Sequence, residues 1–127
     1  MKTEIINIDR IFANLDKNST HRLSQAGGRI RNVLGVEDSW LEFMTKINFW
    51  EWATKFYWDN NKMPVKEFAS LFFLLTQIRN DNKIKVPIVL ARTCKDNKWF
   101  LRNGCHRLSI AKEIGITEIP VSWHEET

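Results

Sequence analysis

Long apolar runs are missing from this sequence of 127 residues. A membrane-spanning helix needs about 18 or more apolar residues in succession, and no stretch of the chain approaches that length. The first ten residues, MKTEIINIDR, also lack the apolar segment of a secretory signal peptide. We therefore expect a soluble, cytoplasmic protein without a membrane partner.

Cysteine is scarce as well, with only Cys94 and Cys105. Two cysteines are too few for a disulfide framework or a closed zinc site, and in a reducing compartment they are expected to be free thiols. The three histidines, His21, His106 and His124, show no metal-ligand spacing with them. The sequence therefore predicts no metal site formed by histidines and cysteines.

A strong excess of one charge is also missing, because 19 basic and 15 acidic residues leave a net charge of +4. This charge suits an anionic ligand but falls short of a nucleic-acid-binding signature. Hydrophobic residues make up 43% and charged residues 27% of the chain, which is ordinary for a globular protein. The length suits a single domain, residues 1–127.

Aromatic residues, in contrast, are plentiful, and many lie in one segment. Ser39 and Glu42 form an S-x-x-E capping box at the start of this segment. No glycine or proline occurs between Trp40 and Trp58. A helix is predicted at Trp40–Trp58, whose apolar residues cover more than one face, as in a buried core helix. The alternative is an aromatic face that binds a protein partner. Its candidate residues are Trp50, Trp52 and Trp58.

The segment Leu15–Arg31 reads as a loop, because it is polar and contains Gly27 and Gly28. Glycines flanked by arginines can form a backbone nest that binds anions, so Arg29 and Arg31 are candidate phosphate ligands. A solvated basic loop is the alternative interpretation.

The remaining elements are predicted from hydrophobic periodicity and turn residues. Their order is strand, loop, two helices, hairpin, helix and strand, which indicates an α/β (α+β) domain. The expected elements are a strand at Glu4–Phe12, a helix from Pro64 that ends at Asn80–Asn82, strands at Val86–Arg92 and Lys98–Arg102 joined by a turn at Cys94–Asn97, a helix between Gly104 and Gly115, and a strand at Ile119–Trp123.

The stretch Asn103–Arg107 lies where the second hairpin strand is expected to end and the next helix to begin. A helix N-terminus presents unpaired backbone N–H groups and the positive end of the helix dipole. Gly104 permits the close approach of a phosphate, Arg107 adds a fork of donors, and His106 adds a further donor. The junction is therefore a candidate phosphate site.

Cys105 lies in the same junction, where the helix dipole and Arg107 would both favour its thiolate and make it a nucleophile. The alternative is a small side chain that packs at the end of a strand. The residues alone leave both interpretations open.

Residues 65–123 resemble the ParB/sulfiredoxin superfamily in the order and spacing of several short motifs. These are Gln77–Asn80 (QIRN), Val86–Leu90 (VPIVL), Gly104–Arg107 (GCHR), Ala111–Gly115 (AKEIG) and Ile119–Val121 (IPV), and INIDRI at Ile6–Ile11 is similar to the family's first strand. The resemblance implies a ParB/sulfiredoxin-like fold, with a small mixed sheet packed against helices. Residues 13–63 would add a loop and a Trp-rich helix that are atypical of the family.

In this superfamily the G-x-x-R loop and the following helix bind nucleotide phosphates. The resemblance implies that Asn103, Gly104, His106 and Arg107 bind ATP or another NTP, with Mg²⁺ as counter-ion. The tetrapeptide GCHR is also the sulfiredoxin signature. That identity implies catalytic roles for Cys105 as nucleophile and for His106 and Arg107 as phosphate partners, in the ATP-dependent reduction of a peroxiredoxin sulfinic acid.

Three classes of function therefore remain open. The leading hypothesis is a nucleotide-binding protein that acts as an NTP-dependent phosphotransferase or NTPase, and the second is a sulfiredoxin-type reductase. The third is a non-catalytic module, of a kind found in bacteria and phages, that binds a protein through the Trp-rich helix or a nucleic-acid strand through the basic loop and aromatic residues.

Overall fold

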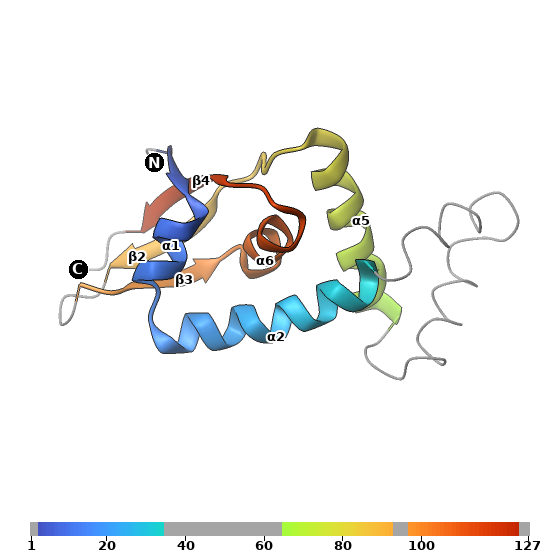
Figure 1. Ribbon diagram of the computed structural model, residues 1–127, viewed down its shortest axis with the longest axis horizontal. Coiled ribbons are helices and arrows are strands. Elements are labelled where there is room, and N and C mark those ends of the chain that lie inside the picture. The colour runs from blue at the N-terminus through green and yellow to red at the C-terminus, as the bar shows by residue number, and fades with distance from the viewer. Residues whose placement is uncertain (1–2, 35–64, 93–96, 125–127) are drawn as a thin grey trace, which may run out of the picture.

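The computed structural model describes residues 3–34, 65–92 and 97–124 (Figure 1). Four helices and four strands lie in these residues, which confirms the mixed α/β class. The elements are β1 (Thr3–Asn7), α1 (Ile8–Asn14), α2 (Lys17–Leu34), α5 (Val65–Asp81), β2 (Ile88–Arg92), β3 (Trp99–Asn103), α6 (Cys105–Ile114) and β4 (Glu118–His124).

The four strands form one open, mixed sheet in the order β1-β4-β2-β3. The outer pairs, β1 with β4 and β2 with β3, are antiparallel, and the central pair, β2 with β4, is parallel. In the parallel pair Ile88 lies opposite Val121, and neither side chain is exposed to solvent. The expected hairpin and the expected mixed sheet are thus both confirmed.

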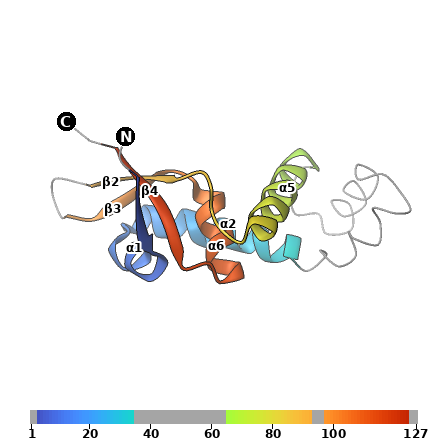
Figure 2. The ribbon, with the colours of Figure 1, turned by 90° about the horizontal axis from the view of Figure 1, so that it is seen from above.

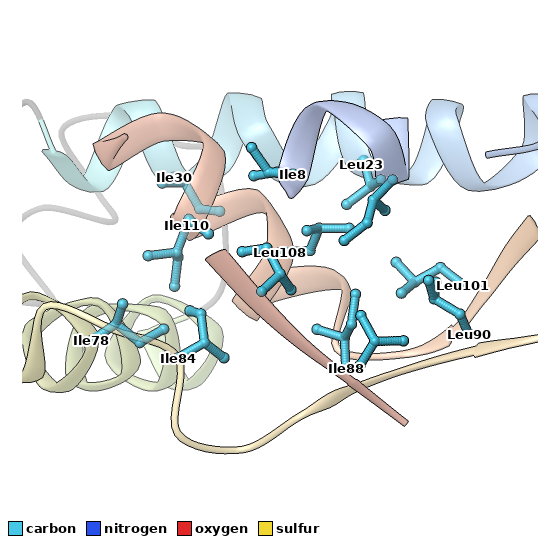
Figure 3. Close-up of a cluster of buried hydrophobic side chains, with 14 of the residues drawn as sticks. Ile8, Leu23, Ile30, Ile78, Ile84, Ile88, Leu90, Leu101, Leu108 and Ile110 are labelled. Atoms are coloured by element: carbon cyan, nitrogen blue, oxygen red, sulfur yellow. The ribbon is translucent and has the colours of Figure 1, made fainter. Parts of the chain in front are cut away.

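Helix α6 lies between α2 and α5, and α5 also packs against α2 (Figures 1 and 2). Apolar side chains from the sheet and from α1, α2, α5 and α6 meet in one core (Figure 3). Each such buried aliphatic side chain stabilises the fold by roughly 1.5–3 kcal/mol. Those labelled in the figure are Ile8, Leu23, Ile30, Ile78, Ile84, Ile88, Leu90, Leu101, Leu108 and Ile110.

The strand predicted at Glu4–Phe12 is only half correct, because β1 ends at Asn7 and α1 begins at Ile8. The Asn7 side chain caps the helix by accepting a hydrogen bond of 2.9 Å from the Asp9 backbone N–H. Ile8 and Ile11, three residues apart, are both buried, which is a helical spacing rather than a strand spacing. The Asn7 N-cap thus ends the strand inside a stretch that appears to alternate.

The loop predicted at Leu15–Arg31 is wrong, because Lys17–Leu34 is the helix α2. Asp16 accepts a hydrogen bond of 2.9 Å from the Ser19 backbone N–H at its start. A buried stripe then runs along the helix and packs on α6, and it outweighs the low helix propensity of the two glycines. The stripe consists of Leu23, Ala26 and Ile30.

The other predicted elements are confirmed with ends shifted by a few residues. The helix from Pro64 is α5, the strand at Val86–Arg92 is β2, and the closing strand is β4. The helix predicted at Trp40–Trp58 lies outside the described residues, and so do Trp50, Trp52, Trp58 and Cys94. Among the helices that the structure describes, none is both long and apolar enough to span a membrane.

Candidate functional site

A pocket of about 220 Å³ opens where β3 ends and α6 begins. Every residue that the sequence places at this junction lines it, and basic side chains from α2 and β3 lie beside them. Among the described residues that line it, none is acidic. The lining consists of Arg22, Leu74, Arg102, Asn103, Gly104, Cys105, His106 and Arg107.

Gly104 shapes the floor of this pocket. Its φ of 97° lies in the left-handed region, and a Cβ atom built on it would lie 2.7 Å from the Ile88 Cγ2 atom. Only glycine adopts this conformation easily, and only glycine leaves room for β2 at this point. The backbone of α6 therefore begins tightly against the sheet.

The first backbone N–H groups of α6 face this junction without a side-chain cap. Gly104 offers no capping side chain, and the Leu108 N–H is the first to bond within the helix, to the Gly104 carbonyl at 2.9 Å. The amides of Cys105, His106 and Arg107 precede that bond and have no acceptor in the helix ladder. Together with the helix dipole they favour an anion at this end of α6.

The Arg107 guanidinium is bound by the residue just before β2, and only part of its hydrogen-bonding capacity is used. Its Nη2 atom donates a hydrogen bond of 3.1 Å to the Pro87 carbonyl. Its Nε atom is buried and has no hydrogen-bond partner among the described residues. Burial lowers the pKa of the guanidinium, because the charged form loses water contacts. An anion in the pocket would compensate for that loss, so Arg107 fits a phosphate ligand.

Two basic residues of this pocket, Arg22 and Arg102, are absent from the sequence prediction. Arg22 belongs to α2, and its Nη1 atom donates a hydrogen bond of 2.9 Å to the Leu101 carbonyl of β3. A loop, as predicted for its segment, would not place Arg22 at this site, whereas the helix α2 does. Arg102 belongs to the predicted strand and precedes Gly104 by only two residues, so the sequence alone places it next to the junction.

Cys105 and His106 are both half-buried and line the pocket. Cys105 is a free thiol at the first position of α6, and its side chain also packs against the hydrophobic core. The structure thus confirms the packing that the sequence offers as one alternative, while the reactivity of the thiol stays a prediction.

Arg29 and Arg31 do not line this pocket. Both belong to α2, so the backbone nest predicted for a loop does not form: neither Gly27 nor Gly28 has a positive φ. The Arg31 Nη1 atom instead lies 2.7 Å from the Glu113 Oε1 atom, near the other end of α6. The structure therefore separates these two arginines from Gly104 and Arg107.

A protein-bound metal has little support at this site. Within residues 3–34, 65–92 and 97–124 no cluster of three or more histidine, cysteine or carboxylate side chains could hold one. Mg²⁺ prefers oxygen ligands and often binds mainly through substrate phosphates and water. In this pocket it would therefore be held by the phosphates themselves.

Comparisons with family models, with curated proteins and with solved structures found no match to this chain. The resemblance to the ParB/sulfiredoxin superfamily thus rests on the quoted motifs alone.

Proposed function

We propose that the protein has a ParB/sulfiredoxin-like fold and binds the phosphates of an NTP at Gly104–Arg107, as a phosphotransferase or NTPase. One observation carries this proposal. A helix N-terminus that begins at a glycine and basic side chains from three elements line the same pocket, and no acidic residue lines it in the part of the chain that the structure describes. Backbone amides and guanidinium groups are the donors that proteins commonly use for phosphate.

The contact between Arg107 and Pro87 supports the resemblance. Pro87 belongs to the VPIVL motif and Arg107 to the GCHR motif, and a hydrogen bond of 3.1 Å joins them. Two motifs that lie far apart in the sequence are thus in contact, and the residue just before β2 orients the Arg107 guanidinium. This contact gives a physical reason for both motifs to occur together.

A sulfiredoxin-type reductase is the second candidate, and the position of Cys105 favours it. Its thiol lies in the same pocket as His106 and Arg107, so a phosphorylated sulfinic acid bound there would be within reach. Cys105→Ser is expected to abolish the reduction of a hyperoxidised peroxiredoxin and to leave nucleotide binding unchanged. Reduction by the serine variant, or none by the wild type, would exclude this candidate.

Thermal unfolding with a panel of ATP, ADP, CTP and GTP, each with Mg²⁺, tests the binding proposal. A ligand that binds only the folded state raises the melting temperature, by about 10 °C for a domain of this size at a ligand concentration of about 100 Kd. We expect at least one nucleotide to do so. Arg107→Met keeps the apolar stem of the side chain but removes the donors, and it should lose this stabilisation.

Arg29→Gln is the matched control, because it removes the same charge from a residue that does not line the pocket. It should keep the wild-type response. Two results would contradict the proposal: no stabilisation of the wild type by any nucleotide, or equal stabilisation of wild type and Arg107→Met.

A further inference from the structure

The two edges of the sheet differ in how the chain covers them. The strand order makes β1 and β3 the edge strands. At β3 the backbone of Leu101 is hydrogen-bonded by Ser19 and Arg22 of α2. Within the part of the chain that the structure describes, β1 pairs with β4 alone. An edge of this kind is a template for pairing with a further strand.

The backbone groups on the outer edge of β1 follow from its register with β4. The Ile8 N–H donates a hydrogen bond of 2.8 Å to the carbonyl of Thr117, just before β4, and this pair continues the register of the two strands. In an antiparallel pair every second residue bonds to the neighbouring strand, so the residues two and four positions before Ile8 also face β4. The groups that face away from β4 are those of Thr3 and Ile5 and the N–H of Asn7.

Ile5 lies at the centre of this edge, and its side chain faces solvent. It is 62% exposed, the highest value among the large hydrophobic residues that the structure describes. Its neighbour Ile6 is only 3% exposed and belongs to the core. The open backbone edge therefore lies beside an aliphatic side chain whose burial would be favourable.

A second copy of β1 complements this edge when Ile5 lies opposite Ile5. In that antiparallel register Thr3 lies opposite Asn7 of the second copy, so the outward-facing residues all meet outward-facing residues. Glu4, the charged residue of β1, then lies opposite Ile6 of the second copy. A shift of two residues in one direction would place the two Glu4 carboxylates opposite each other, which is unfavourable. A shift in the other direction would leave Thr3 without a partner residue in β1.

The rest of the fold is compatible with this pairing. Helix α1 follows β1 at Ile8, and in an antiparallel pair the two copies of α1 begin at opposite ends of the paired strands. Strand β3, which contributes to the pocket at the start of α6, is the other edge strand. Pairing through β1 therefore leaves the pocket of each copy accessible.

We propose that two copies of the chain pair antiparallel through β1, with Ile5 at the two-fold axis, and join their sheets into one. The hydrogen-bonded contact involves only the five residues of β1 in each copy. Interfaces of small area are weak, so the dimer forms at high protein concentration. This inference does not depend on the proposed nucleotide site.

Sedimentation velocity of the full-length protein, at concentrations up to about 1 mM, tests the pairing. We expect a concentration-dependent dimer. Ile5→Lys places two like charges at the two-fold axis. Ile5→Pro removes an N–H that faces away from β4, a change that an edge strand tolerates. Each variant should raise the dimer Kd by at least about tenfold.

Val86→Lys is the matched control, because Val86 is also exposed, at 57%, but lies outside β1. It should keep the wild-type Kd. Urea unfolding curves show which variants are folded, and dimerisation is compared among those.

Ile5→Cys and Thr3→Cys test the register. The two Ile5 Cα atoms would lie about 5.5 Å apart in a hydrogen-bonded pair, which suits a disulfide. The two Thr3 Cα atoms would be offset by four residues, or about 14 Å. Mild oxidation should therefore cross-link the Ile5→Cys protein, and the Thr3→Cys protein should behave like the wild type.

Three results would overturn the proposal. The first is a wild type that stays monomeric at every concentration, and the second is a dimer that both Ile5→Lys and Ile5→Pro leave unchanged. The third is slow hydrogen exchange of the Ile5 amide in the monomer, which would show that another segment of the chain covers this edge. Equal cross-linking of the two cysteine variants would overturn the register about Ile5.

Discussion

Two glycines flank α6, Gly104 at its N-terminus and Gly115 at its C-terminus, and their surroundings differ. Gly104 and Gly115 both have positive φ, 97° and 86°. A Cβ atom at Gly104 would lie 2.7 Å from Ile88, whereas nothing lies within 4 Å of one at Gly115. An alanine would therefore have an unfavourable backbone conformation at either position. Only at Gly104 would it also clash with β2.

This difference predicts unequal effects of the two alanine substitutions. Gly115→Ala should lower the free energy of unfolding by about 1–2 kcal/mol, the cost of a left-handed alanine. Gly104→Ala should lower it by about 2–5 kcal/mol, because displacement of Ile88 adds the cost of overpacking. Urea unfolding curves measure both. Equal losses would show that the contact with Ile88 does not constrain the site.

Arg107 shows how the burial of a charged side chain can oppose folding. Its pKa is lowered by burial, so the charged guanidinium costs folding free energy at every pH below its folded-state pKa. The cost disappears as the pH rises between the folded-state and unfolded-state pKa values. A bound anion would reduce it.

At the scale of the elements, α2 protects the exposed edge of the sheet. Strand β3 lies at one edge, where unpaired backbone groups invite pairing with other chains. The start of α2 satisfies them: the Leu101 N–H donates to the Ser19 Oγ atom at 2.9 Å, and Arg22 donates to the Leu101 carbonyl. The Asp16 N–H also donates to the Trp99 carbonyl, at 2.8 Å.

Ser19→Ala tests this role of α2. It removes a buried acceptor and leaves the Leu101 N–H unsatisfied, which should cost about 1–3 kcal/mol of unfolding free energy. Ser24→Ala on the same helix is the control, because Ser24 is exposed and should change stability by less than about 0.5 kcal/mol. Urea unfolding of both variants decides the matter, and a Ser19→Ala protein as stable as its control would refute the edge-capping role.

At the scale of the whole molecule, the two halves of the sequence differ in how well they predict the structure. The C-terminal half carries local signals at its element ends, such as Gly104 and Gly115, and its hairpin, helix and final strand were predicted correctly. The formation of α2, in contrast, depends on contacts with other elements and not on local residues. Two glycines suggest a loop, and only packing of the helix on α6 shows that they are tolerated.

The residues of the candidate site also differ in how well the sequence predicts them. Gly104–Arg107 are neighbours in the chain, so a strand-to-helix junction was enough to find them. Arg22 lies 79 residues from Leu101, its hydrogen-bond partner, and no local pattern links the two. Its place in the pocket depends on the position of α2 beside β3, which a pattern search along the sequence does not provide.

Backbone amide NMR of the ¹⁵N-labelled protein, titrated with ATP and Mg²⁺ and then with CTP, tests whether the start of α6 binds the phosphates of a nucleotide. We expect the amide signals of Cys105, His106 and Arg107 to shift most in at least one titration, with those of Arg22 and Arg102 next. Unchanged amide signals at these positions in both titrations, or larger shifts at the opposite end of α6 around Glu113, would exclude phosphate binding at this helix N-terminus.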